Sequence, residues 1–152
     1  MKPLFLEHCI NAGYYIFPCD FNKKPIVENT EHAISMAIEY TNSLRKGHKQ
    51  IWQTALDNNN AILCGEINKL LIIDVDRKNG GIYQWNELLK LNNDGLDLKT
   101  YKVRTPSGGI HYYFKANIDT MNLITYFDIR LLNNFLSGID FLANNGYALL
   151  PY

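Results

Sequence analysis

Two aspartates at the end of a short apolar run are the residues of this sequence best suited to chemistry. Asp74 and Asp76 close the segment Leu70–Asp76, which is rich in Leu, Ile and Val and therefore predicts a buried β-strand. Side chains two residues apart on a strand share a face, so we expect the two carboxylates to project together, roughly 6.5 Å apart along the backbone. A divalent cation with oxygen ligands would offset their mutual repulsion. Metal binding is therefore the first hypothesis for this segment.

A third acid has a similar context. Asp140 lies between Ile139 and Phe141 in another short apolar segment, so we expect its side chain to point away from theirs. Three carboxylates can hold two metal ions about 3.5 to 4 Å apart, which is the arrangement that polymerases use for nucleotidyl transfer. Each acid taken alone is as readily a structural or solvated residue, and it is the set of three that favours a metal site.

A glycine-containing turn and a histidine form the second chemical feature. The candidates for contacts with phosphate are Ser107, Gly108, Gly109 and His111 and, with less support, Lys102 and Arg104 on the strand before the turn. The two glycines permit close approach of the backbone to a ligand, and their amides together with the serine hydroxyl can meet phosphate oxygens. The imidazole can donate a further hydrogen bond, and the two basic side chains can add charge-assisted contacts.

Length and composition are typical of one soluble domain. The chain has 152 residues, 47% of them apolar, and no run approaches the roughly 18 apolar residues of a membrane span. The N-terminal Leu4–Leu6 patch is followed at once by Glu7 and His8, so we do not read it as a signal peptide. We expect an intracellular protein without membrane contact.

Charge and cysteine content add two further constraints. Fifteen basic and fifteen acidic residues cancel, which argues against a protein that coats nucleic acid through bulk charge. Cys9, Cys19 and Cys64 are odd in number and lack a zinc-binding spacing, so we expect reduced thiols in a reducing compartment.

The elements that must position these residues follow from apolar periodicity. Helices are predicted over 4–12, from a cap at Thr30, around 51–56, after Gly80–Gly81, and over most of 116–137. Strands are predicted over 14–17, 61–64, 70–76, 101–105, 110–115, 138–142 and 147–150. Successive strands suggest three hairpins, across Gly65–Glu66, across 106–109 and across Asn144–Gly146. The fold class is α/β or α+β with a mixed or antiparallel sheet.

Taken in order, these motifs resemble the prim-pol domain of the archaeo-eukaryotic primase superfamily. The resemblance is carried by Ile-Asp-Val-Asp, then Thr-Pro-Ser-Gly-Gly-x-His, then Gly-Ile-Asp before Asn-Gly-Tyr-Ala-Leu-Leu-Pro. Segments 13–18, Lys24–Pro25 and 60–65 are similar to that family's early strand, Lys-Pro loop and the strand before its acidic motif. The resemblance covers about Gly13 to Pro151.

The resemblance implies a template-directed DNA primase and polymerase domain. Asp74, Asp76 and Asp140 would ligate Mg²⁺ or Mn²⁺, and His111 would contact the phosphates of the incoming nucleotide. The implied fold has two parts, a helix and strand unit and an RNA-recognition-like C-terminal unit, with the active site between them. The implied partners are a single-stranded DNA template and primer, nucleoside triphosphates, and a helicase domain or another replication protein. We expect residues 1–152 to form one catalytic domain excised from a longer primase-helicase.

Two other functions fit part of the pattern. A glycosyltransferase of the Asp-x-Asp type would explain Asp74 and Asp76 but neither the glycine turn with His111 nor Asp140. A catalytically inactive prim-pol-like module that binds nucleic acid or a replication protein would retain all the motifs. Metal-dependent nucleotide incorporation separates these possibilities from a polymerase.

Overall fold

The chain folds into two compact units, each with its own antiparallel sheet. A computed structural model describes residues 2–26, 32–117, 119–120, 122, 136–144 and 146–151. The first unit comprises Met1–Asn68 and Asn145–Tyr152, and the second comprises Lys69–Asn144. The chain thus leaves the first unit after Asn68 and returns to it after Asn144.

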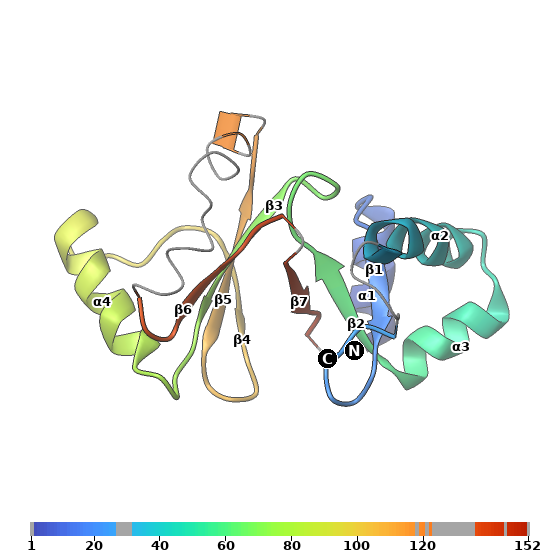
Figure 1. Ribbon diagram of the computed structural model, residues 1–152, viewed down its shortest axis with the longest axis horizontal. Coiled ribbons are helices and arrows are strands. Elements are labelled where there is room, and N and C mark those ends of the chain that lie inside the picture. Colours follow the sequence, from blue (N-terminus) through green and yellow to red (C-terminus); the bar gives the residue numbers. More distant parts are fainter. Residues whose placement is uncertain are drawn as a thin grey trace. The chain divides into compact units, whose positions relative to one another are not determined.

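In the described part of the first unit, three helices accompany a three-stranded sheet. The helices are α1 (Lys2–Asn11), α2 (Ala33–Arg45) and α3 (Lys49–Asp57), and the strands are β1 (Ile16–Cys19), β2 (Asn59–Leu63) and β7 (Tyr147–Leu149). The strand order is β1-β2-β7, and both pairs are antiparallel (Figure 1).

A buried threonine joins α2 to the outer edge of this sheet. The Thr41 hydroxyl accepts a hydrogen bond from the Ile16 N–H at 2.9 Å and donates one to the Ile16 carbonyl at 3.1 Å. Strand β1 lies at the edge of the sheet, and the Ile16 N–H and carbonyl bond to Thr41 rather than to a further strand. Ala37, one turn earlier on α2, packs with Phe17 and Ala61 in the core of the unit.

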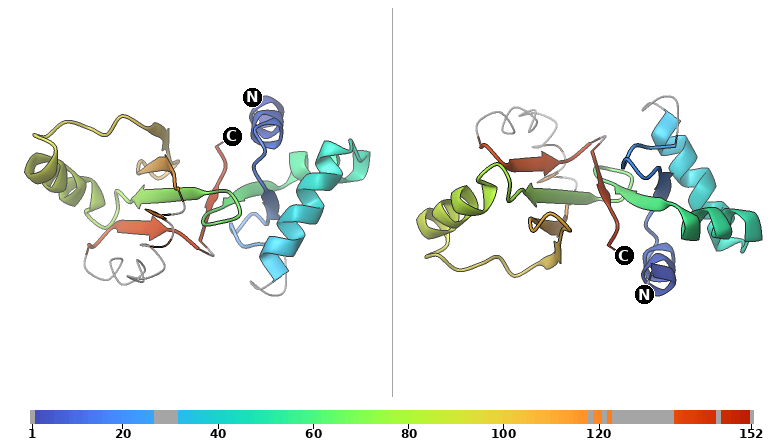
Figure 2. Two further views of the ribbon diagram at one scale, coloured as in Figure 1. Left: turned by 90° about the horizontal axis from the view of Figure 1, so that it is seen from above. Right: turned by 90° about the horizontal axis from the view of Figure 1, so that it is seen from below.

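Among its described residues, the second unit carries a four-stranded sheet and the 12-residue helix α4. Its elements are β3 (Leu70–Val75), α4 (Gly81–Asn92), β4 (Tyr101–Arg104), β5 (Ile110–Lys115) and β6 (Ile139–Leu142). The order is β4-β5-β3-β6, and every neighbouring pair is antiparallel. Strand β3 therefore has a neighbour on both sides, and β6 runs beside it in both views of Figure 2.

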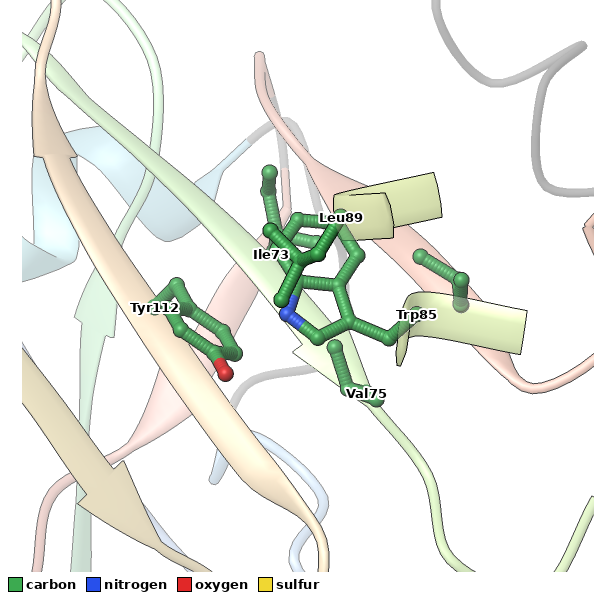
Figure 3. Close-up of a cluster of buried hydrophobic side chains, with 6 residues drawn as sticks. Ile73, Val75, Trp85, Leu89 and Tyr112 are labelled. Atoms are coloured by element: carbon green, nitrogen blue, oxygen red, sulfur yellow. The ribbon is translucent and has the colours of Figure 1, made fainter. Parts of the chain in front are cut away.

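Helix α4 covers one face of this sheet. Trp85 and Leu89 pack against Ile73, Val75 and Tyr112, as Figure 3 shows. The Trp85 and Tyr112 rings lie 5.0 Å apart between centroids. Alternate residues of β3 thus form a buried apolar row under the helix, and the residues between them face the other way.

Most of the predicted elements are confirmed, but two hairpins are wrong. The predicted helices at 4–12, 51–56 and after Gly80–Gly81 are α1, α3 and α4, and the β4–β5 hairpin is present. Strand β2 does not pair with β3, nor β6 with β7, because in each case the turn carries the chain from one sheet to the other. Pro18 does not end β1 as expected but lies within it, which an edge strand tolerates.

The structure does not test some of the predictions. The cap at Thr30 and most of the helix predicted over 116–137 fall on residues outside the described ranges. The mixed helix and strand composition with antiparallel sheets confirms the fold class, whereas the likeness of the second unit to an RNA-recognition fold stays a prediction. Within the described part of the chain, no helix has the length and apolar character needed to cross a membrane.

Candidate active site

Three of the predicted site residues lie in one row across the sheet of the second unit. Asp74 of β3 is directly opposite His111 of β5 on one side and Asp140 of β6 on the other. Directly opposite residues of antiparallel strands point to the same face, with Cβ atoms about 4.5 to 5.5 Å apart. Ile73 and Val75 face α4, so the row occupies the other face. Asp74, His111 and Asp140 are distant in sequence but adjacent in the sheet, because β3 lies between β5 and β6.

The His111 imidazole lies beside the Asp74 carboxylate. Nε2 of His111 is 3.4 Å from Oδ1 of Asp74, which makes an ion pair only when the imidazole is protonated. The two side chains are 12% and 32% exposed. The buried Nδ1 has no hydrogen-bond partner among the residues that the structure describes. Among the described residues, the polar contact of the imidazole is thus at Nε2.

Asp140 lies in a field of negative charge. Partial burial and the nearby carboxylates of Asp74 and Asp76 raise the pKa of Asp140 above its usual value. Among the described residues no lysine or arginine forms an ion pair with any of these three acids. The site therefore gathers negative charge without a protein cation to offset it, a condition that favours binding of a metal cation.

Asp76 lies just beyond the end of β3, and its carboxylate is bonded to the following turn. Oδ1 accepts a hydrogen bond from the Lys78 N–H at 3.0 Å, and Oδ2 accepts one from Nδ2 of Asn79 at 2.9 Å. The Asp76 N–H donates to the Gly138 carbonyl at 2.7 Å. Although β3 ends at Val75, the charges of Asp74 and Asp76 both raise the pKa of Asp140, so both carboxylates lie near Asp140.

The donor set has the chemistry that Mg²⁺ or Mn²⁺ requires, although the side chains do not converge as they stand. Within the described ranges, no group of three or more His, Cys, Asp and Glu side chains is placed to hold a metal ion. Asp74, Asp76 and Asp140 nevertheless supply uncompensated oxygen ligands, the type that these cations prefer. Asp76 keeps one lone pair on each oxygen. Reorientation of Asp74 and Asp140 would be needed to complete a ligand group.

In the turn between β4 and β5, the glycine N–H groups donate hydrogen bonds within the turn itself. The Gly108 N–H donates to the Thr105 carbonyl and the Gly109 N–H to Thr105 Oγ1, both at 2.9 Å. The Thr105 and Ser107 hydroxyls are also hydrogen-bonded to each other, at 2.9 Å. Contact of these amides with phosphate, as the sequence suggests, would require the turn to open and stays a prediction. Gly109 has a clearer structural role, since a Cβ there would lie 2.5 Å from the Val75 carbonyl oxygen.

Lys102 and Arg104 are not brought together with His111. They pair with Tyr112 and Ile110, whose side chains lie on the α4 side of the sheet. Lys102 Nζ also forms a 2.6 Å ion pair with Asp97. The predicted phosphate contacts of these two residues therefore have no support from the geometry.

Sequence reasoning missed several residues that shape the site. Asn79, Gly81 and Gly138 surround Asp76, and the Arg77 side chain lies against Gly108, 3.0 Å from the place a Cβ would take. An asparagine three residues after an aspartate, just before two glycines, is typical of a turn with side-chain hydrogen bonds. The sequence predicts a turn over 77–81, but not the hydrogen bond from Asn79 to Asp76.

The comparison with known families decides the assignment. The model of the N-terminal region of bifunctional DNA primase/polymerases matches residues 6–152. The chain belongs to this prim-pol family. The match spans every candidate residue of the prim-pol domain and confirms the predicted resemblance. No curated protein matches the chain closely enough to count. The family assigns the chain as a DNA primase/polymerase domain that serves DNA replication.

Proposed function

We propose that this prim-pol domain is a metal-dependent nucleotidyltransferase that adds nucleotides to a primer on a single-stranded DNA template. The observation that carries the proposal is the row His111, Asp74 and Asp140 with Asp76 at the end of the same central strand. Negative charge gathers at that point, and no lysine or arginine pairs with it among the described residues. Family membership supports the same reaction.

The residues have separable roles in this proposal. Asp74, Asp76 and Asp140 would hold Mg²⁺ or Mn²⁺. When bound, such ions lower the pKa of the attacking 3′-hydroxyl and neutralise charge that develops on the phosphates. His111 would donate a hydrogen bond from Nε2 to a phosphate oxygen of the nucleoside triphosphate, in place of its contact with the Asp74 carboxylate. We further propose that the protein is intracellular. Its partner would be a helicase domain or another replication protein.

Primer extension with Mg²⁺ or Mn²⁺ tests the reaction. We expect extension by the unmutated chain and none by the Asp74→Ala/Asp76→Ala variant, because the missing carboxylates remove metal ligands. Asp57→Ala is the matched control, since Asp57 is exposed at the end of α3 in the other unit. Loss of extension in the control as well, or extension by the double variant, would contradict the site assignment.

The role of His111 has a separate test. His111→Ala should raise the KM for the nucleoside triphosphate several-fold and lower kcat less, because the lost contact is to the bound phosphates. Equal nucleotide affinity in this variant and the unmutated chain would remove His111 from the binding site.

Two observations favour a second function. The three acids do not converge, and the glycine amides are used within their turn. An inactive module that binds nucleic acid or a replication protein would share both features. Absence of extension together with absence of Mn²⁺ and nucleotide binding would favour that module. Neither the fold nor the family match supports the glycosyltransferase alternative.

A further inference from the structure

Asn79 holds the carboxylate of Asp76 in a single orientation. Its Nδ2 donates to Oδ2 of Asp76 at 2.9 Å, while the Lys78 N–H donates to the other oxygen at 3.0 Å. Both oxygens are thus fixed by donors from the turn that follows them. A carboxylate with two such hydrogen bonds has its side-chain rotation restricted before any ligand arrives.

The backbone of Asn79 is held in turn by the segment that leads into β6. Ser137 Oγ donates to the Asn79 carbonyl at 3.1 Å, and the Gly138 carbonyl accepts from the Asp76 N–H at 2.7 Å. A Cβ built on Gly138 would lie 2.9 Å from the Asn79 carbonyl oxygen. The turn after β3 and the approach to β6 are therefore one connected structure, and Asn79 joins them to Asp76.

The other two acids lack this support. Within the part of the chain that the structure describes, the only polar partner of the Asp74 carboxylate is the His111 imidazole, at 3.4 Å, and the Asp140 carboxylate accepts no hydrogen bond. Of the three carboxylates, only Asp76 is thus fixed before a metal binds. The other two remain able to turn towards a cation.

We propose that Asn79 is a positioning residue for the metal site, which holds Asp76 as the fixed ligand around which Asp74 and Asp140 close. This inference rests on the proposed function. Each Asp76 oxygen keeps a second lone pair for a cation while the hydrogen bonds from the turn persist. Loss of a partner that orients a metal ligand typically weakens metal binding 10-fold to 100-fold. The Asn79 side chain donates to Asp76, so its effect on metal binding should pass through Asp76.

The test measures Mn²⁺ binding to the full 152-residue chain in the absence of nucleotide and DNA. The variants are Asn79→Ala, Asp76→Asn and the two combined, and calorimetry or the electron paramagnetic resonance of free Mn²⁺ gives the dissociation constants. Asn92→Ala is the matched control, because Asn92 is also exposed in the second unit and donates to a backbone carbonyl of α4. Thermal unfolding of the metal-free proteins checks that the variants fold.

We expect Asn79→Ala to weaken Mn²⁺ binding about tenfold. Asn92→Ala should leave the affinity unchanged, and Asn79→Ala should add nothing to Asp76→Asn. An unchanged affinity in Asn79→Ala, or an equal further loss in the Asp76→Asn background, would overturn the role of Asn79 and leave the proposed function intact. Absence of Mn²⁺ binding by the unmutated chain would overturn the metal site itself and the role of Asn79 with it.

Discussion

Replacement of Gly81 by alanine should destabilise the second unit through a single steric conflict. A Cβ on Gly81 would lie 1.9 Å from the Gly138 carbonyl oxygen and 2.6 Å from that of Asp76. Both contacts are with backbone atoms, so no side-chain rotation can relieve them. Strand β6 or the start of α4 must move, and the hydrogen bond from the Asp76 N–H to the Gly138 carbonyl is stretched or lost.

The size of the effect follows from three contributions. Overpacking of a well-packed site costs about 1 to 3 kcal/mol, and this contact belongs at the upper end because it involves backbone on both sides. Loss of the hydrogen bond adds about 1 kcal/mol. The better helix propensity of alanine returns at most about 1 kcal/mol. The free energy of unfolding of Gly81→Ala should therefore fall by about 3 kcal/mol.

Gly80→Ala is the matched control. Gly80 has a φ of +78°, and a Cβ there would meet nothing within 4 Å. Its substitution should cost only the conformational strain of a left-handed residue, about 1 kcal/mol. Comparison of the two variants thus separates the loss of stability caused by a steric clash from the loss caused by backbone strain.

Urea unfolding, followed by tryptophan fluorescence and circular dichroism, measures both variants. Trp85 on α4 reports on the affected core. In a separate thermal unfolding experiment, the melting temperature of Gly81→Ala should fall by roughly 6 to 12 °C. This follows from about 2 to 4 °C per kcal/mol for a chain of this size. A loss in Gly81→Ala no larger than in Gly80→Ala would show that β6 does not approach α4 closely, and the account of the Asp76 surroundings would fail.

Three further changes test other parts of the structure. Asp140→Asn should raise the metal-free stability by a few tenths of a kcal/mol, about as much as an exposed charge interaction contributes, because it removes repulsion from two acids; urea unfolding without metal measures it. Thr41→Val should lower stability by about 1 to 3 kcal/mol, whereas Thr41→Ser should not, because the valine leaves both backbone groups of Ile16 unpaired. Burial raises the pKa of Cys9 to about 11, and burial with a nearby carboxylate raises that of Cys19 to about 12, so alkylation at pH 8 should be slow until the protein is unfolded.

The local patterns were sufficient to predict which residues share a face. Ile73 and Val75 pack under α4 while Asp74 faces the other way, as alternation along a strand requires. Tyr112 and His111 alternate in the same way along β5. These predictions succeeded because the two-residue period of a strand is a property of each strand alone and needs no knowledge of its neighbours.

Pairing between strands was predicted less well, because it depends on contacts distant in sequence. Asn144–Gly146 carries a strong hairpin signal, and Gly65–Glu66 a weaker one, yet both turns connect strands of different sheets. A turn signal establishes that the chain changes direction, but not that the two flanking strands pair. The packing of two separate cores determines that outcome here.

The candidate site shows the same division between local and long-range information. Sequence motifs identified Asp74, His111 and Asp140, but their meeting depends on the order β5-β3-β6 and on registers between distant segments. A slip of one residue in either pairing would place His111 or Asp140 on the α4 side, where Lys102 lies. The apolar residues that alternate with the acids prevent such a slip, because it would expose them. The core under α4 therefore sets the register that brings the acidic residues and the histidine together.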